Sequence, residues 1–438
     1  MSAGSTSAPR DRLGRRIIGF AGLPFLSLIT PFLFLPILAR VAGPEAWLAI
    51  AVGQSSGGFF ALVVGLGYNT VGPPMVAVAD PAHRPSLLAR SLRARVLVWV
   101  PSTVLAVLVA VLVAPASHRL EAGLMAAAMT LTGLSSAWYM IGLGRASLIA
   151  IYEIGPRIVA TVAAAVIVIT GGPVVWYPIL LIVALIVSVG GYAASILKVR
   201  DVLAGPWSEV AAVFARNRAA VATEVAGGAY NSLAVTFIGA SATTAQAAAY
   251  VSGDKLYRIG QYSVSALGNA LQGWVVERGS DEFGARIRRA FLLHLALGLM
   301  GFAAFALFGP WLSAVLFGPA VAIDLVTALG LGTATLGIAL GTALGRITLI
   351  SMGANRAFLA SVLLAASVGV PAIILLSSAF GAAGGAWGLA IGETVSVTAQ
   401  AISVLWLRRR ARGLRVAPHL LAQGTEGSAG HPSQSPPP

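Results

Sequence analysis

A stripe of polar and charged side chains follows the otherwise apolar segment 244–277, which is long enough to cross a bilayer. Steps of three or four residues place its members on one face of a 3.6-residue helix: Asp254, Arg258, Gln261, Ser265, Asn269 and Gln272. A charge at mid-membrane depth costs roughly 2.5–3.5 kcal/mol on insertion scales, so such groups face a protein interior or a water-filled cavity. The stripe therefore predicts the wall of a polar cavity. The alternative is that Asp254 and Arg258 form an i,i+4 ion pair that only stabilises packing.

The composition is that of an integral membrane protein. Of the 438 residues, 57% are hydrophobic and 10% are charged, and the mean hydropathy is +0.86. Soluble domains carry about 25% charged residues. There is no cysteine, and the five histidines lack the spacing of metal ligands. We therefore expect neither a bound metal nor a cofactor, and no nucleotide-binding loop is recognisable.

Twelve apolar segments are long enough to span a bilayer. We predict spans at 17–41, 45–67, 94–114, 120–142, 148–170, 173–197, 219–240, 245–276, 288–308, 322–345, 356–378 and 383–407. The first span follows an arginine-rich N-terminal segment and is too long for the apolar core of a signal peptide. We therefore predict that it remains in the mature protein as a membrane helix.

Basic residues concentrate in the turns on the side that holds both termini. Among them are Arg84, Arg90, Arg93 and Arg95 before or at the start of the third span, and Arg408, Arg409 and Arg410 after the last. The opposite side holds only Arg40 and Arg119. The positive-inside rule then makes both termini cytoplasmic and requires an even number of spans. The net charge of +14 follows from this bias and does not indicate nucleic-acid binding.

The longest internal loop divides six spans from six. The predicted divisions are a cytoplasmic segment 1–16, a first lobe 17–198, a cytoplasmic loop 199–218, a second lobe 219–407 and a basic, then disordered tail 408–438. GRASLIA at the start of the fifth span matches NRAFLAS, 211 residues later, at the start of the eleventh. With six spans in each half, this match indicates two repeats that enter the membrane in the same sense.

A second ionic pair lies in the fifth span, where Glu153 and Arg157 are one helical turn apart with Pro156 between them. At 1.5 Å per residue, Arg157 lies about 16 Å from the start of its span and Arg258 about 20 Å from the start of its own. Both reach the midplane, one from each half, which is where a site between two repeats would lie. Two separate structural pairs remain the alternative.

Other polar residues within spans are Gln54 and Asn69 in the second, Glu224 and Asn231 in the seventh, and Glu393 in the twelfth. Amides in membrane helices more often join helices by hydrogen bonds than bind ligands. A lone carboxyl such as Glu393 is either a proton- or cation-coupling site or a protonated structural group.

Three stretches resemble bacterial polysaccharide flippases. ILARVAGPEAWLAIAVGQSSGGFFALVVGLGYNTVG (Ile37 to Gly72) is similar to their first two spans, and AAAYVSGDKLYRIGQ is similar to their eighth, with Gly253 in place of Ala. GAAGGAWGLAIGETVSV places Glu393 where the family has Glu. The chain thus resembles Wzx-like flippases of lipid-linked oligosaccharides, in the multidrug/oligosaccharidyl-lipid/polysaccharide (MATE-like) superfamily.

The resemblance implies an all-α fold of two six-helix lobes, alternating access, a bacterial inner-membrane location and a polyprenyl-pyrophosphate-linked oligosaccharide as substrate. Membrane lipids, a polysaccharide polymerase and glycosyltransferases would be its partners. We expect Arg157, Arg258 and Lys255 to hold the pyrophosphate, because guanidinium and ammonium groups bind phosphate oxygens. Neutral partners for sugar hydroxyls would be Gln261, Asn69, Asn231, Asn269 and Tyr68. Charge balance or ion coupling would fall to Asp254, Glu153, Glu224 and Glu393.

Two other functions were weighed against this one. An ion-coupled multidrug antiporter of the same superfamily would need an acidic cavity for cationic drugs, whereas this interior has three cations against a similar number of acids. A membrane enzyme acting on the same glycan would usually carry a large outer loop with catalytic residues, and every outer loop here is short. We therefore expect a transporter rather than an enzyme.

Overall fold

The computed structural model describes residues 34–198, 200, 202, 208–275 and 283–415, so most of the first predicted span and the terminal segments lie outside it. The described chain is helical throughout its ordered elements and contains no strand. The longer helices are α2 (Gly43–Gly65), α3 (Tyr68–Val78), α4 (Arg84–Val113), α5 (Arg119–Leu131), α6 (Ala137–Gly142), α8 (Gly155–Ile169), α9 (Trp176–Ile196), α11 (Ser208–Ser241), α12 (Thr244–Val275), α13 (Phe283–Phe317), α14 (Leu325–Gly341) and α15 (Asn355–Arg415).

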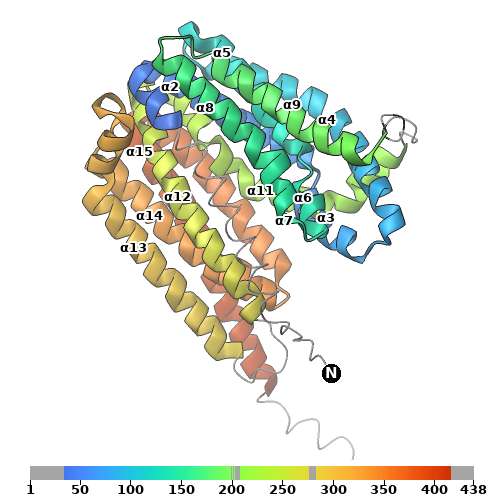
Figure 1. Cartoon of the computed structure of the whole chain (residues 1–438). Helices are drawn as coiled ribbons and strands as arrows, with labels where there is room; N and C mark the ends of the chain where they lie inside the picture. The colour runs from blue at the N-terminus through green and yellow to red at the C-terminus, as the bar shows by residue number, and fades with distance from the viewer. Residues whose placement is uncertain (1–33, 199, 201, 203–207, 276–282, 416–438) are drawn as a thin grey trace, which may run out of the picture.

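The helices form two lobes that lie together at one end of the molecule and diverge toward the other (Figure 1). The first lobe contains α2 to α9, and the second contains α12 to α15. Helix α11 packs against α2 and α4 of the first lobe and against α15 of the second. We call the end at which α2 begins and α13 finishes the outer end, and the end at which α15 finishes the inner end.

Within the described residues, eight helical stretches are long and apolar enough to cross a membrane. The twelve predicted spans agree with them once three differences are recognised. Helix α15 contains both 356–378 and 383–407, which meet at Gly381, where φ is 58°. Helices α11 and α12 coincide with 219–240 and 245–276 but carry charged residues at membrane depth. The first span is mostly outside the described residues. The predicted two-lobed, all-helical membrane fold is therefore confirmed.

Helix α2 is the central helix of the assembly. Every residue from Ala46 to Gly53 is buried, as expected for a helix that is apolar on all sides. A Cβ atom on Gly53 would lie 2.5 Å from the carbonyl oxygen of Ala122, so this glycine lets α5 approach closely. At the same level Trp47 donates a hydrogen bond across the lobes to the Ala248 carbonyl at 3.2 Å.

The contacts between α2 and α12 show that these two helices run parallel where the lobes meet. Trp47 contacts Ala248, and seven residues later Gln54 contacts Lys255, so both chains advance in the same direction. Parallel helices at this boundary are compatible with two repeats that enter the membrane in the same sense.

The lobes are also tied at the outer end. Arg40 donates from Nε to the Leu316 carbonyl at 3.1 Å and from Nη2 to the Val315 carbonyl, near the end of α13. These carbonyls lack helical partners, and a cation there also complements the helix dipole. The ring of Trp47 packs on Phe317 with centroids 5.4 Å apart. Contacts of this kind hold the lobes together on this side.

The prediction that Arg93 and Arg95 lie in an exposed basic turn was wrong. Arg95 is only 1% exposed and lies inside the first lobe, because α4 begins at Arg84 and carries Arg95 into the bundle. Arg93 is also buried, and its Nε donates to the Val202 carbonyl at 2.6 Å. In addition α11 begins at Ser208, which shortens the predicted loop 199–218. The bias of basic residues toward the inner end persists without Arg95.

Reporter fusions will test the orientation. We expect fusions after Gly171, Ala242 and Gly381, which lie in outer turns, to be active only outside the cytoplasm. Fusions after Gly284 and Arg412 should report inside, because the basic turns near them oppose translocation. The measurement is the ratio of alkaline phosphatase to green fluorescent protein signal at each site. An outside signal after Gly284 would contradict the assigned orientation.

Candidate functional site

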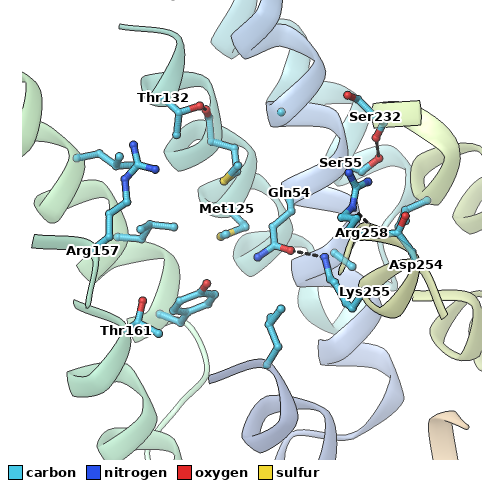
Figure 2. Close-up of a pocket in the computed structure, with 18 of the residues that line it drawn as sticks. Gln54, Ser55, Met125, Thr132, Arg157, Thr161, Ser232, Asp254, Lys255 and Arg258 are labelled. Atoms are coloured by element: carbon cyan, nitrogen blue, oxygen red, sulfur yellow. Dashed lines mark hydrogen bonds and ion pairs between the residues drawn. The ribbon is translucent and has the colours of Figure 1, made fainter. Parts of the chain in front are cut away.

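A cavity of about 370 Å³ lies between the two lobes. Its lining comes from both lobes, with α2 and α12 on one side and α5, α8 and α9 on the other (Figure 2). The polar lining residues are Gln54, Ser55, Thr132, Arg157, Thr161, Tyr177, Ser232, Asp254, Lys255, Arg258 and Tyr262. Leucine, methionine, isoleucine, valine and alanine side chains form most of the remainder. The cavity therefore combines an apolar wall with a few ionic groups.

Helix α12 supplies three ionic groups to the cavity. Arg258 donates from Nε to Asp254 Oδ2 at 2.8 Å, so the predicted i,i+4 pair is present. The Asp254 side chain is 3% exposed, whereas that of Arg258 is 31% exposed toward the cavity. Lys255 reaches the other lobe and donates from Nζ to Gln54 Oε1 at 2.8 Å. The spacing of these residues along one helix brings all three to the same wall, as Figure 2 shows.

The first lobe supplies Arg157 from the start of α8, on the opposite side of the cavity (Figure 2). Its Nη2 donates to Glu153 Oε2 at 3.1 Å, and its side chain is 32% exposed. Glu153 itself is buried in a π-helical turn, Ala150–Ile154, and does not line the cavity. Glu153 also accepts hydrogen bonds from Ser135 Oγ and from the Ser136 backbone. The predicted pair therefore exists, with only the arginine facing the cavity.

Asn231 and Gln261 connect α11 to α12 beside the cavity. Gln261 Nε2 donates to Asn231 Oδ1 at 3.2 Å, and Arg258 Nη2 donates to the Asn231 carbonyl at 3.4 Å. Neither amide lines the cavity. Their geometry matches the interhelical role that amides usually have in membranes. The Asn231 carbonyl orients Arg258 from the side of α11.

Five further candidates lie away from the cavity. Asn69 is exposed near the inner end, and Asn269 accepts a hydrogen bond from Arg346 at 2.6 Å. Glu224 accepts one from Thr70 at 2.6 Å. The other two are buried: Tyr68 packs on Trp138 with centroids 4.9 Å apart, and Glu393 sits against Gly337 inside the second lobe. These five residues cannot touch a ligand in the cavity without a rearrangement.

Sequence reasoning undervalued Gln54 and missed Arg95. The sequence signal of Gln54, an amide within a span, favours helix packing. In the structure this residue lines the cavity and accepts a hydrogen bond from Lys255. Arg95 was placed in a basic turn because it lies at the edge of the span 94–114, and no feature of the sequence marks it as buried.

Cations exceed anions at the cavity surface. Among the described residues that line it, Arg157, Lys255 and Arg258 are basic, and Asp254 is the acidic one. Glu153 partly compensates Arg157 from behind the wall. A low-dielectric pocket with excess positive charge favours an anionic ligand, and arginine can bind phosphate or carboxylate oxygens in a bidentate manner. The geometry is thus suited to an anion at mid-membrane depth.

No protein-family model matches the chain, and no curated protein matches it in sequence. Solved structures do match its fold. An inward-facing multidrug-resistance MATE transporter of the MOP superfamily has a TM-score of 0.65 at 17% identity, covering 91% of this chain and 96% of its own. The lipid II flippase MurJ in an inward closed conformation has a TM-score of 0.60 at 11% identity, covering 88% of this chain and 86% of its own.

A third solved structure, a MOP-superfamily transporter from Pyrococcus furiosus, has a TM-score of 0.55 at 17% identity and covers 91% of this chain and 96% of its own. That transporter is described as having a binding pocket of reverse polarity. Together these likenesses show that the chain has the MATE fold, whose twelve membrane helices form two lobes. At such low identity they show the fold alone.

The Asp254–Arg258 pair permits a direct test of charge burial. We expect Arg258→Gln to destabilise the protein by about 3–5 kcal/mol, because the buried Asp254 carboxylate loses its partner. Adding Asp254→Asn should recover most of this stability, since removing both members of a pair is often neutral. Thermal unfolding midpoints in lipid nanodiscs measure both effects. A double variant as unstable as Arg258→Gln would argue against the pairing.

Proposed function

We propose that this protein flips a polyprenyl-pyrophosphate-linked oligosaccharide, a precursor of cell-surface polysaccharide, from the cytoplasmic to the outer leaflet of a bacterial inner membrane. The observation that carries this proposal is the cavity between the lobes, with three basic side chains and one acidic side chain at its surface. A pyrophosphate headgroup cannot cross hydrocarbon unaided, whereas its lipid tail can remain in the bilayer. A cationic cavity within the membrane would bind the headgroup and so lower the cost of moving it across the hydrocarbon.

The lining residues fall into two groups, one suited to the pyrophosphate and one suited to the sugar of such a substrate. Arg157 and Arg258 approach from opposite lobes and would clamp the pyrophosphate from two sides, with Lys255 as a point charge. Hydroxyl and amide groups around them would bind the sugar; these are Gln54, Ser55, Thr132, Thr161 and Ser232. Gln54 would release Lys255 when the anion arrives, because the two side chains hydrogen-bond to each other.

The arrangement of the lobes supports alternating access. Ties between the lobes at the outer end involve Arg40, Trp47 and Phe317, while the lobes diverge toward the inner end (Figure 1). With the basic inner end in the cytoplasm, a headgroup would enter from the side on which the precursor is made. Breaking the outer contacts and closing the inner side would then expose the cavity to the outside.

The shared fold supports transport in general. One of the proteins with this fold is a lipid II flippase, and another is a multidrug-resistance transporter. The excess of cations in this cavity disfavours the alternative of an antiporter for cationic drugs. Glycosyltransferases and a polysaccharide polymerase would be functional partners, since one class of enzyme makes the substrate and the other consumes it.

The charge-paired double variant tests the proposal. We expect Asp254→Asn with Arg258→Gln to be stable but inactive, because the double variant removes the cation that would hold the pyrophosphate. Loss of export should exceed about tenfold, the effect expected when a charged contact to substrate is removed. The readout is accumulation of lipid-linked oligosaccharide at the cytoplasmic face of a strain that depends on this gene, with membrane abundance as control. Full export by the double variant would refute the substrate-binding role of Arg258.

Two carboxyl groups outside the cavity are proposed to couple transport to an ion. Glu224 has one carboxylate oxygen, Oε2, buried without a hydrogen-bond partner, and Glu393 is buried in the second lobe. If either exchanges a proton during transport, substitution by Gln should flatten the pH dependence of transport and leave pyrophosphate binding intact. Flux assays in proteoliposomes across a pH series measure this. Unchanged pH profiles in Glu224→Gln and Glu393→Gln would exclude both residues as coupling sites.

A further inference from the structure

Three helical segments of the first lobe are interrupted at one place. Helices α2 and α3 are separated by Leu66 and Gly67, with φ of 48° and 70°. Helices α5 and α6 are separated by a short helical turn and by Ser135, which has an extended backbone. The third interruption is the π-helical turn before α8, which carries Glu153. Interrupted helices leave backbone groups without partners inside the membrane, and these groups need other donors and acceptors.

A single buried guanidinium, that of Arg95, occupies this place. Its Nη1 donates to the carbonyl oxygens of Gly133 at 3.1 Å and Ser135 at 2.7 Å, which lie at the break before α6. Its carbon centre lies 5.6 Å from the ring centroid of Tyr68 and 5.7 Å from that of Trp138. No carboxylate binds it directly in the described structure, so its charge is held by carbonyl dipoles and aromatic faces.

Glu153 binds the same break from the other side. Its Oε1 accepts from Ser135 Oγ at 2.6 Å and from the Ser136 backbone N–H at 3.1 Å. Its Oε2 accepts from Arg157 Nη2 at 3.1 Å. Ser135 thus joins Arg95 to Glu153, and Arg95 and Glu153 also attract each other electrostatically. The result is a chain of contacts from Arg95 through Ser135 and Glu153 to Arg157 at the cavity surface.

We infer that Arg95 is a positioning residue for the anion site: it shares the charge of Glu153 and thereby leaves Arg157 with positive charge for the ligand. This inference rests on the proposed function, since it concerns the anion that the cavity would bind. The group formed by Arg95, Glu153 and Arg157 contains two guanidinium ions and one carboxylate, so it carries a net positive charge, and Arg157 presents this charge to the cavity. If a neutral residue replaced Arg95, the negative charge of Glu153 would compensate the positive charge of Arg157 completely.

Charge rescue separates this role from a structural one. In the full-length protein in nanodiscs, with inorganic pyrophosphate as the probe, we expect Arg95→Gln to weaken binding about tenfold, the effect of one charge acting at roughly 10 Å in a medium of intermediate dielectric constant. Adding Glu153→Gln should restore affinity to within about threefold of the wild type, because the excess positive charge returns. A purely structural Arg95 would predict a double variant weaker than either single variant.

Two further variants complete the experiment. Glu153→Gln alone should bind pyrophosphate more tightly than the wild type, because the carboxylate that opposes Arg157 is removed. If Arg95→Gln alone fails to fold, the double variant remains decisive, since affinity near that of the wild type is expected only if the two charges offset each other. Arg93→Gln is the matched control: it removes a buried arginine from the same helix, one whose Nε donates to the Val202 carbonyl, and should leave affinity unchanged.

The outcomes distinguish the two proposals. Rescue by the double variant supports the inference, and binding by Glu153→Gln that is no tighter than that of the wild type overturns it. Binding by the wild type with no effect of Arg95→Gln, or with a double variant weaker than the single, overturns the inference and leaves the anion site intact. Absence of pyrophosphate binding by the wild type would refute the anion site and the role of Arg95 with it.

Discussion

The structure depends on one constraint, which is that ions inside a bilayer must be compensated by the protein. Unpaired charge at this depth is costly, and hydrogen bonds or opposite charges must replace the water that an ion loses. Around the cavity, two clusters of ionic groups meet this requirement, one in each lobe. The ionic groups concerned are Arg95, Glu153 and Arg157 in the first lobe and Asp254, Lys255 and Arg258 in the second. In both places the compensation is incomplete at the cavity surface, where positive charge remains.

The two lobes compensate their charges by different means. In the second lobe an unbroken helix, α12, places Asp254 and Arg258 one turn apart, and α11 adds the Asn231 carbonyl. In the first lobe the partners come from interrupted helices, whose free carbonyl and N–H groups bind Arg95 and Glu153. Irregular backbone at membrane depth is tolerated where protein surrounds it. The interruption therefore provides the polar groups that a regular helix would have used internally.

The sequence predicted the spans and the α12 wall well because both are local properties. Apolar length defines a span, and a period of 3.6 residues places Asp254 and Arg258 on one face whatever the neighbours are. Long-range placement was less predictable. Asn69 and Asn269 have the same residue type as Asn231, yet they lie near the inner end, and Tyr68 packs in the core. Arg95 resembled the basic residues of a turn, and only the start of α4 at Arg84 shows that it is enclosed.

By itself, the sequence determined that the chain is a helical membrane protein with charges inside its spans. Those conclusions follow from composition and periodicity, which do not depend on contacts between distant segments. Only the tertiary structure decided which charges share a cavity, because that depends on how α2 and α12 meet at the boundary of the lobes. The pairing of Gln54 with Lys255 and the contacts of Arg95 with Gly133 and Ser135 join residues far apart in the chain. Such contacts arise from packing, and no local pattern in the sequence specifies them.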